Sequence, residues 1–457
     1  MSDSKAIFLT SIQQSVKDSA LRNKISAAAK NHKTAFEEGK KQYSKLEIAR
    51  QRAAFIRWKA IENLDKYLIE FEAAFIKKGG KTIWAQDAGE AADEILKIVN
   101  RFPDGSVVKS KSMVTEEIGL NNVLKKNKHD VVETDLGQYI VQVTNDTPSH
   151  LVMPVLHKSK EEIIDLFHST NDKIETAEDV VQFTRSVLRE KYINASVGIT
   201  GANFIIADAG AIAITENEGN AVLSASMPQI HIVVTGMDKV IPSLNDLDLF
   251  LPLLSVFGTG QPLTVYNTII SGPCGTDEGS GPSEMYVVLV DNGRTSVISD
   301  EIQRQSMHCI HCGACAFNDP VYRIIGGHAY GNIYNGPFGS VMLPHKGNPN
   351  EYMHLNEAHP LDGSATEICP VNIDFNKLFL QNRKAAADGQ LAGKSEKWFY
   401  FFWKKAVLKR NLIKLTGIKT LGYFVNTIFN KSANNLRELR EPPKKSFNEQ
   451  WREKMKL

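Results

Sequence analysis

The chain of 457 residues is 42% hydrophobic and 23% charged, which is ordinary for a soluble globular protein, and its length suggests about three domains. Its five cysteines are too few for a disulfide framework, and it lacks both a secretory signal pattern and an apolar run of about 18 residues that would span a membrane, so we expect a cytoplasmic protein. The net charge of +2 is uneven, because residues 394–457 carry 16 Lys and Arg against 5 Glu, which leaves the rest of the chain negative.

Residues 1–76 are predicted to form an N-terminal helical region. Apolar residues recur there every three or four positions, which places them on one face of a helix. They are Ala53, Ile56, Ala60, Leu64, Leu68, Phe71 and Phe75. The pattern predicts one long amphipathic helix that ends at Gly79-Gly80.

Residues 77–296 alternate between strand and helix patterns. A short strand, KTIWA, is followed by Asp87 and Glu90 at the spacing of a capping box, which predicts a helix to about Asn100. A second strand over Ser106–Lys109 leads into a helix entered at Thr115.

Further strands are expected in the runs VVETDLGQYIVQV, NFIIADAGAIAITE, HIVVTG and MYVVLVDNG, several of them separated by helical segments such as SKEEIIDLFHS and AEDVVQFTRSVLREKY. Such alternation predicts an α/β domain with a mostly parallel sheet. Beyond Ile302 the strand pattern disappears, and GGHAYGNIYNGPFG is expected to be an ordered loop.

The segment MHCIHCGACAFNDP carries three cysteines spaced C-x2-C-x2-C. Thiolates at this spacing hold three corners of a [4Fe–4S] cluster, and in two-cluster ferredoxin modules the fourth ligand is a distant cysteine that precedes proline. Cys369-Pro370 supplies such a residue. The pattern therefore predicts one [4Fe–4S] site with Cys309, Cys312, Cys315 and Cys369 as its ligands.

The ligands of a second cluster have all been replaced. Asp319 stands before Pro320 where the crossed pattern needs cysteine, and His359, Asp362 and Ala365 occupy the three positions that precede Cys369 at the same spacing. We therefore predict that the second cluster is deleted. Zinc, which usually takes two separated cysteine pairs, no metal at all, and another metal on Asp319, His359 and Asp362 remain alternatives.

Several other residues are candidates for function. His308 and His311 are interpreted either as hydrogen-bond donors to cluster sulfur or as surface histidines. The loop SGPCGTDEGSGPSE (271–284) is equally a structural turn or a ligand loop, and its Cys274 is expected to be inert. TENEGN (215–220) is either a recognition group at a strand end or a solvated turn, whereas His231 is expected to be a core histidine.

The last segment, residues 388–457, is a basic and aromatic tail that begins its charged part with KSEKWFYFFWKK. A basic amphipathic helix suits the inner face of an anionic membrane, and it suits equally the acidic body of the chain or a partner subunit. No helix-turn-helix or zinc-finger pattern accompanies it, so we expect no nucleic acid partner.

The order of these elements resembles the lactate-utilisation protein B family. The matching segments include VVKSKSMVTEEIGLN (107–121), GITGANFIIADAGAIAITENEGNAVLSASMPQIHIVVTGMDKV (198–240) and GPSEMYVVLVDNGR (281–294), and the resemblance extends from about residue 45 to 387. It implies a lactate-utilisation α/β domain (NagB/RpiA/CoA-transferase-like) over 77–296 and an α-helical ferredoxin-like module over 297–387. The family usually has two complete cluster motifs, Glu where this chain has Gln138, and Thr or Ser where it has Ala209.

The resemblance implies a function for the whole chain. It implies an iron–sulfur electron-transfer subunit, not itself catalytic, within a complex that oxidises L-lactate or a related 2-hydroxy acid. An electron-donating dehydrogenase and other subunits would be its partners. The alternatives are a non-catalytic assembly or redox-sensing protein with a structural cluster, and an enzyme whose chemistry lies in the α/β domain near TENEGN and the glycine loop.

Overall fold

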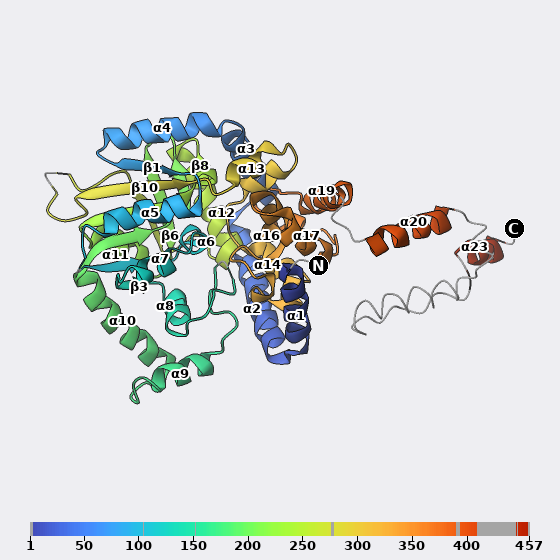
Figure 1. Ribbon diagram of the computed structural model, residues 1–457, viewed down its shortest axis with the longest axis horizontal. Helices are drawn as coiled ribbons and strands as arrows, with labels where there is room; N and C mark the ends of the chain where they lie inside the picture. The colour runs from blue at the N-terminus through green and yellow to red at the C-terminus, as the bar shows by residue number, and fades with distance from the viewer. Residues whose placement is uncertain are drawn as a thin grey trace. The chain divides into compact units, whose positions relative to one another are not determined.

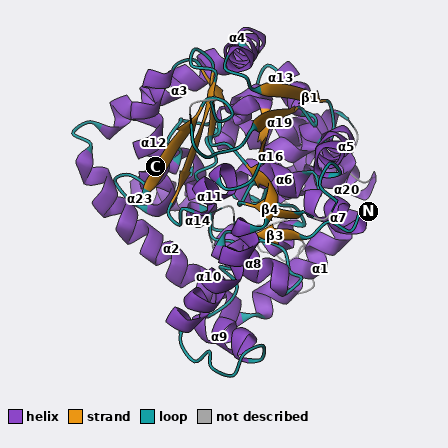
Figure 2. Ribbon diagram, turned by 90° about the vertical axis from the view of Figure 1, so that its left-hand side faces the viewer, coloured by secondary structure: helices purple, strands orange, loops and turns teal. Residues whose placement is uncertain are grey.

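The computed structural model of the chain describes residues 3–103, 105–150, 152–275, 278–389, 394–408, 445 and 447–455. The chain forms two compact units, residues 1–384 and 385–457. The helices and strands of the first unit are shown in Figure 1 and, by type of secondary structure, in Figure 2.

The N-terminal region is helical, as predicted, but the apolar stripe runs over two helices rather than one. The region consists of α1 (Asp3–Lys17), α2 (Ser19–Gly39), α3 (Leu46–Glu62) and α4 (Leu64–Lys77). Asn63 breaks the expected single helix, with φ −127° and ψ 40°, while its side chain donates to the carbonyl of Lys59 at 2.9 Å. Asparagine competes with the helical hydrogen bonds in this way, whereas the buried stripe from Ala53 to Phe75 continues across the break.

A six-stranded sheet forms the centre of the α/β part, and all of its strands are parallel. Its order is β1 (Lys81–Ala85), β10 (Glu284–Val290), β7 (Ile230–Gly236), β4 (Ala195–Thr200), β2 (Ser106–Lys109) and β3 (Val131–Glu133). The central strand β7 is buried along its whole length, as strands covered on both faces are. The predicted parallel sheet is therefore confirmed.

Helices precede and follow the strands of this sheet in the chain, and several of them, among them α5, α10 and α11, pack on it (Figure 1). They are α5 (Ala88–Val99), α6 (Met113–Glu117), α7 (Leu120–Lys126), α8 (Leu136–Val143), α9 (Lys160–His168), α10 (Ala177–Ile193), α11 (Asn220–Ser226), α12 (Leu247–Thr259) and α13 (Arg294–Ser299). Asp87 caps α5 by accepting from the main-chain N–H of Glu90 at 2.9 Å, as predicted. The Glu90 carboxylate accepts from the N–H of Gln86 rather than from that of Asp87, as a full capping box would require.

The run VVETDLGQYIVQV was expected to be strand, and that prediction is wrong beyond Glu133. The Asp135 side chain accepts from the N–H of Gln138 at 2.9 Å and so begins helix α8. An aspartate at this position stabilises the first turn of a helix, which ends the strand after three residues.

A second, four-stranded sheet was not predicted. Its order is β8 (Val240–Ile241), β5 (Phe204–Ile206), β6 (Ala211–Glu216) and β9 (Tyr266–Ile270). The run NFIIADAGAIAITE therefore forms an antiparallel pair, β5 and β6, rather than one strand. Gly210 makes the turn with φ +49°, and a Cβ there would lie 2.5 Å from the main chain of α4, so only glycine fits this close approach.

After β10 the described part of the first unit is helical, as the loss of the strand pattern predicted. A 3₁₀ helix (Gln303–His308) is followed by α14 (Ala314–Asn318), α15 (Tyr322–Ile325), α16 (Gly336–Lys346), α17 (Pro349–Ala358), α18 (Ser364–Ile368) and α19 (Phe375–Asp388). The stretch expected to be loop contains a 3₁₀ turn and the start of α16. One hydrophobic core joins these helices to the N-terminal ones through Phe8, Ile25, Tyr322, Phe338 and Phe375.

The second unit contains the helices α20 (Lys394–Leu408) and α23 (Phe447–Met455) among its described residues. Trp398, Phe401 and Phe402 of α20 are exposed. Residues 409–444, which make up much of the predicted basic tail, lie outside the described residues. Of the helices that the structure describes, none is both long and apolar enough to cross a membrane.

Candidate functional site

The four cysteines that the sequence pattern groups together surround one small cavity. Cys309 and Cys312 come from the turn between the 3₁₀ helix and α14, Cys315 lies in the first turn of α14, and Cys369 directly follows α18. All are free thiols. The remaining walls are almost entirely apolar, formed by Ile310, Gly313, Phe338, Pro370, Val371, Ile373 and Phe375.

Left-handed main-chain conformations fold the cysteine turn so that its sulfurs converge. His311 has φ +58° and Gly313 has φ +79°. Main-chain amides point at the sulfurs: the N–H of His311 donates to Cys309 Sγ at 3.3 Å, and the N–H of Ile373 donates to Cys369 Sγ at 3.4 Å. Such N–H groups stabilise negative charge on sulfur.

The spacing of the sulfurs bears on which metal the residues fit. Among the described residues, Asp146, His157 and His328 are the only group of three whose ligand atoms all lie within 4.8 Å of one another, so no three cysteine sulfurs are that close. A single tetrahedral zinc with Zn–S bonds of about 2.3 Å needs sulfurs about 3.8 Å apart. The donor set fits a [4Fe–4S] cluster better than one zinc ion.

The protonation of the four thiols also depends on a metal. Burial, together with the neighbouring sulfurs, raises the pKa of Cys312 to about 12 and the pKa of Cys309 and Cys315 further. Burial likewise raises the pKa of Cys369. Without a bound cation the thiols would stay neutral, whereas binding of a metal cation would release their protons.

Helix α3 holds both segments that carry the cysteines. The Arg57 guanidinium, which is 1% exposed, donates only to main-chain carbonyls, among them those of Met307 at 2.8 Å and His308 at 3.0 Å. Two turns earlier on α3, Arg50 donates to the carbonyl of Cys369 at 2.8 Å. Burial lowers the pKa of Arg57 only to about 10, so Arg57 is a buried cation next to Cys309.

The residues at the replaced cluster positions bond to other parts of the protein. His359 contacts Asp319 at 3.1 Å through Nδ1 and Ser340 at 3.0 Å through Nε2, and its ring stacks on Phe379 at 4.4 Å. Asp362 instead accepts from Ser364 at 2.9 Å at the start of α18.

These four positions therefore do not form one ligand set. Asp319 has a second partner, the main-chain N–H of Tyr322 at 2.7 Å, and Ala365 is buried without a donor atom. The polar groups of Asp319 and His359 are therefore satisfied by hydrogen bonds within the protein, without a metal.

The two histidines beside the cysteines are not surface residues, so that alternative interpretation is wrong. His308 is 5% exposed, and burial lowers its pKa to about 3 and that of His311 to about 4. Nε2 of His311 lies 3.6 Å from Asp238. The donor found at sulfur is the main-chain N–H of His311 rather than an imidazole.

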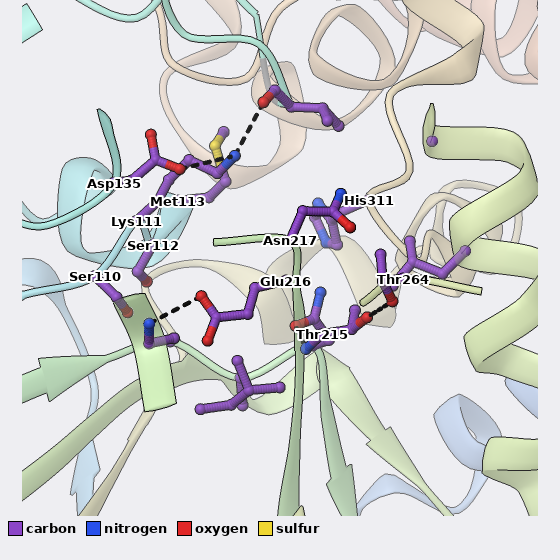
Figure 3. A pocket seen from close by; sticks show the side chains of 18 of the residues that line it. Ser110, Lys111, Ser112, Met113, Asp135, Thr215, Glu216, Asn217, Thr264 and His311 are labelled. Carbon is purple, nitrogen blue, oxygen red and sulfur yellow. Dashed lines mark hydrogen bonds and ion pairs between the residues drawn. The ribbon is translucent and has the colours of Figure 1, made fainter. Parts of the chain in front are cut away.

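A second cavity, of about 270 Å³, lies at the carboxyl ends of β2, β3, β4 and β7, where ligands of parallel sheets bind. Figure 3 shows Glu216 and Asn217 projecting between the side formed by Lys111 and Asp135 and the side formed by His311. Its other polar walls include Ser112, Asn203, Thr215, Glu218, Asn220, Lys239, Ser255, Thr259 and Thr264, and Cys312 closes it beside His311. The TENEGN segment thus lines a cavity, although Asn217 and Glu218 are also exposed to solvent.

Two of the charged groups in this cavity, Lys239 and Glu218, have few partners. Lys239 makes no hydrogen bond or ion pair with any residue that the structure describes, and burial lowers its pKa although the neighbouring Asp238 and Cys309 act in the opposite direction. Glu218 accepts one hydrogen bond, from the N–H of Leu136 at 3.1 Å. Burial and the nearby Asp135 raise the pKa of Glu218 to about 7, so this carboxyl exchanges its proton near neutral pH.

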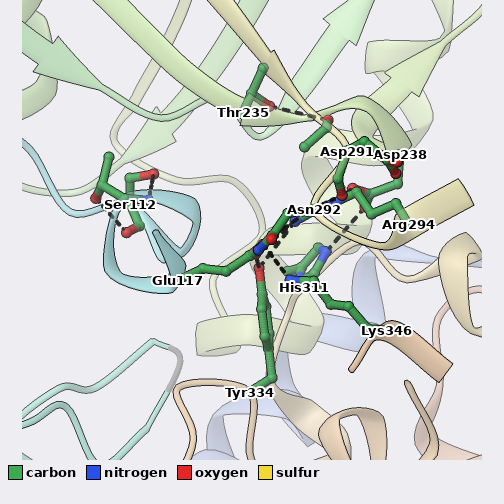
Figure 4. A network of polar contacts seen from close by, with 12 residues as sticks. Ser112, Glu117, Thr235, Asp238, Asp291, Asn292, Arg294, His311, Tyr334 and Lys346 are labelled. Carbon is green, nitrogen blue, oxygen red and sulfur yellow. Dashed lines mark hydrogen bonds and ion pairs between the residues drawn. The ribbon is translucent and has the colours of Figure 1, made fainter. Parts of the chain in front are cut away.

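A buried ionic network joins the main sheet to the helices that follow it (Figure 4). Arg294 binds Glu117 at 2.8 Å and Asp238 at 2.5 Å, while Glu117 also contacts Lys346 and the hydroxyl of Tyr334. Burial alone would raise the pKa of Glu117, but Arg294 and Lys346 outweigh it and lower the pKa to about 2. Glu117 is therefore ionised at neutral pH.

This pKa predicts how stability depends on pH. The stabilisation from Glu117 is present above the ordinary carboxyl pKa of about 4.5 and is lost as the pH falls toward 2, a difference of about 3 kcal/mol. The native chain should have a higher free energy of unfolding than Glu117→Gln at pH 6. We expect this difference to shrink as the pH falls from 6 to 3. Urea unfolding of both proteins measures this, and a constant difference would contradict it. Acid damage elsewhere affects both proteins equally.

The remaining candidates are His231 and the glycine loop (271–284). His231 is fully buried and its Nε2 lies 2.8 Å from the Thr200 hydroxyl, so the prediction of a core histidine is confirmed. In the glycine loop, Glu278 accepts from the N–H of Gly275 at 2.7 Å, and Cys274 is partly exposed. Residues 276–277 of that loop lie outside the described residues.

Sequence analysis missed Arg57, Lys111, Lys239, Glu117 and Arg294. One signal was present for Arg57, because it falls on the apolar stripe four residues after Ala53. Lys111 and Lys239 lie two and three residues after the strands β2 and β7, Glu117 ends α6, and Arg294 begins α13. Nothing local distinguishes these four residues from surface charges.

The fold and the site define an α/β protein followed by a helical segment that carries four cysteines. The family model described as "LUD domain" matches residues 68–290. The chain is 40% identical to the lactate utilization protein B of Bacillus subtilis over 380 residues, which is 82% of this chain and 79% of that protein. It is 40% identical to that of Anoxybacillus flavithermus (82% and 80%) and 44% identical to that of Geobacillus thermodenitrificans (73% and 71%).

The chain belongs to the lactate utilization protein B family. A solved structure, a DUF162 family protein from Deinococcus radiodurans, covers 50% of this chain and 98% of its own, with 14% identity and a TM-score of 0.29, which is too low to define a shared fold.

Proposed function

We propose that this chain serves in lactate utilisation as an iron–sulfur electron-transfer subunit of a complex that oxidises L-lactate or a related 2-hydroxy acid. It would carry one [4Fe–4S] cluster on Cys309, Cys312, Cys315 and Cys369. The observation that carries the proposal is the convergence of four free thiols on one apolar cavity, with no three sulfurs as close as a single zinc ion requires. The names of the relatives support the metabolic role.

The cluster, when bound, would supply one-electron transfer, and the protein would tune it. Apolar walls exclude water, amides of His311 and Ile373 donate to sulfur, and the buried cation Arg57 offsets negative charge. A helical ferredoxin-like module over 297–387 and a dehydrogenase partner belong to the same proposal. So does contact of the basic tail with an anionic membrane surface, supported by the exposed aromatic residues of α20.

Metal analysis and redox titration test this function. Protein purified without oxygen is expected to contain about four iron and about four acid-labile sulfide per chain and to be reduced and reoxidised reversibly by one electron. About eight of each would refute the deletion of the second cluster. Zinc in place of iron would refute the electron-transfer role, and unfolding on each reduction would favour a structural cluster in an assembly or sensing protein.

A further inference from the structure

Asp146, His157 and His328 bring three metal-ligating side chains together outside the two cavities described above. Asp146 and His157 belong to the loop between α8 and α9, whereas His328 begins the 3₁₀ turn between α15 and α16. Nε2 of His157 lies 2.8 Å from Oδ2 of Asp146, and the ring centres of the two histidines are 4.5 Å apart. One ligand atom of each residue lies within 4.8 Å of the other two. The three side chains therefore converge on one point.

Each histidine has a nitrogen that can bind a metal. Nε2 of His328 lies 2.7 Å from the carbonyl of Thr147. Because a carbonyl only accepts hydrogen bonds, this nitrogen carries the proton of the neutral ring, and Nδ1 carries the lone pair. Burial lowers the pKa of His157, so its imidazole is neutral at pH 7. A neutral imidazole is the form of histidine that binds metals.

The protein already orients the His157 ring as a metal ligand would need. Nδ1 of His157 lies 3.0 Å from the hydroxyl of Ser149, which donates to the carbonyl of Pro154 at 3.0 Å. Ser149 is 4% exposed, so water does not compete for this contact. With a metal on Nε2, the Nδ1–H group would donate to the Ser149 oxygen. Histidine ligands of metals usually have such a partner, which fixes the tautomer and the ring orientation.

Asp146 provides the negative charge of the cluster. Its Oδ1 accepts from the N–H of Thr147 at 2.8 Å, while its Oδ2 contacts both His157 and the ammonium of Lys158, the latter at 2.9 Å. Lys158 would therefore compete with a metal for Oδ2. The side chain of Asp146 is 28% exposed, and His328 is exposed and lines a cavity of about 570 Å³. Water can thus reach the cluster and fill the coordination positions that the protein leaves open.

We propose that Asp146, His157 and His328 bind one divalent transition-metal ion, for which zinc fits best. Two imidazole nitrogens and one carboxylate oxygen are a set that zinc accepts at sites with an open position. Bonds of about 2.0–2.2 Å place tetrahedral ligand atoms about 3.4 Å apart. Small side-chain rotations reach that spacing from the 4.8 Å or less found here. The ion would connect the loop between α8 and α9 to the helical segment that carries the cysteines.

Zinc titration of the holoprotein by calorimetry, after a chelator has removed loosely bound metal, tests the site. We expect one zinc ion per chain to bind with a Kd of about 1 µM or below, and Mg²⁺, which prefers oxygen ligands, not to bind up to about 1 mM. His157→Gln and His328→Gln should each weaken zinc binding about 100-fold or more, since each removes a ligand. His168→Gln changes an exposed histidine on α9 and is the matched control.

The substitution Lys158→Met provides a test of opposite sign. It removes the cation that competes for Oδ2 of Asp146, so zinc should bind about threefold more tightly than to the native chain. Zinc held by scattered surface histidines would not respond in this way.

Three outcomes would overturn the proposal. They are no saturable zinc binding up to about 1 mM, Mg²⁺ binding as tightly as zinc, and equal zinc binding by the native chain and both histidine variants. If His157→Gln does not fold, His328→Gln, which changes an exposed side chain, decides alone.

This inference and the proposed function can fail separately. A protein with about four iron per chain that takes up no zinc would refute the inference while leaving the proposed function intact. A protein without iron that binds two zinc ions, one of which is lost in His328→Gln, would support the inference and refute the electron-transfer role.

Discussion

Replacing Cys369 with serine is expected to reduce the iron content from about four per chain to less than one. Cys369 is the only proposed ligand outside the C-x2-C-x2-C turn, and its loss would leave one corner of the proposed cluster without a thiolate. Ile373 would also lose the sulfur to which its N–H donates. Iron, acid-labile sulfide and the visible absorption of anaerobically purified protein measure the effect.

Cys274→Ser is the matched control for this substitution. Cys274 lies in the glycine loop, is partly exposed, and is the one cysteine that does not line the cysteine cavity. The control should retain its full iron content. If Cys369→Ser retained it as well, Cys369 would not be a ligand, and the crossed pattern inferred from the sequence would fail.

The substitution Arg294→Met should lower the free energy of unfolding by about 3–5 kcal/mol, because it leaves the buried carboxylates of Glu117 and Asp238 without their shared cation. The side chain of Asp238 is only 4% exposed, so water cannot replace the lost contacts. Urea unfolding at neutral pH measures the loss.

The exposed Arg189 on α10 provides the comparison, since Arg189→Met should change the free energy of unfolding by less than about 0.5 kcal/mol. Arg294→Lys should fall between the two, because a lysine keeps the charge but not the forked geometry that serves two carboxylates. Equal stabilities of Arg294→Met and Arg189→Met would show that the network contributes no net stability.

The elements that the sequence predicted well are those whose ends are marked locally. The strands β1 and β2 have the predicted bounds, because an apolar run is followed in each case by a residue that caps the next helix, Asp87 or Ser112. The strands of the second sheet have no such local end signals. Gly210 turns the chain inside an apolar run, and only its close contact with α4 shows why. Strand β8 has only two residues, and only its pairing with β5 identifies it.

The candidate site shows the same division. The four cysteines form a local pattern with one distant member, and the pattern was enough to predict that they meet. The cavity beside them is assembled from strand ends that are far apart in sequence, and a lysine such as Lys239 resembles a surface charge until its surroundings are known. The contact between Arg57 and the carbonyl of Met307 spans 250 positions, so no local signal can report it.

Arg50 and Arg57 of α3 bind both segments that carry the cysteines, and this has a consequence for biosynthesis. Arg50 and Arg57 are translated long before the cysteines whose neighbouring carbonyls they bind, and Cys369 is the last part of the site to be made. A nascent chain that stops before residue 369 has the complete LUD domain but only three of the four thiols. Insertion of the proposed cluster is therefore expected only after translation of residue 369, when α3 can contact both cysteine segments.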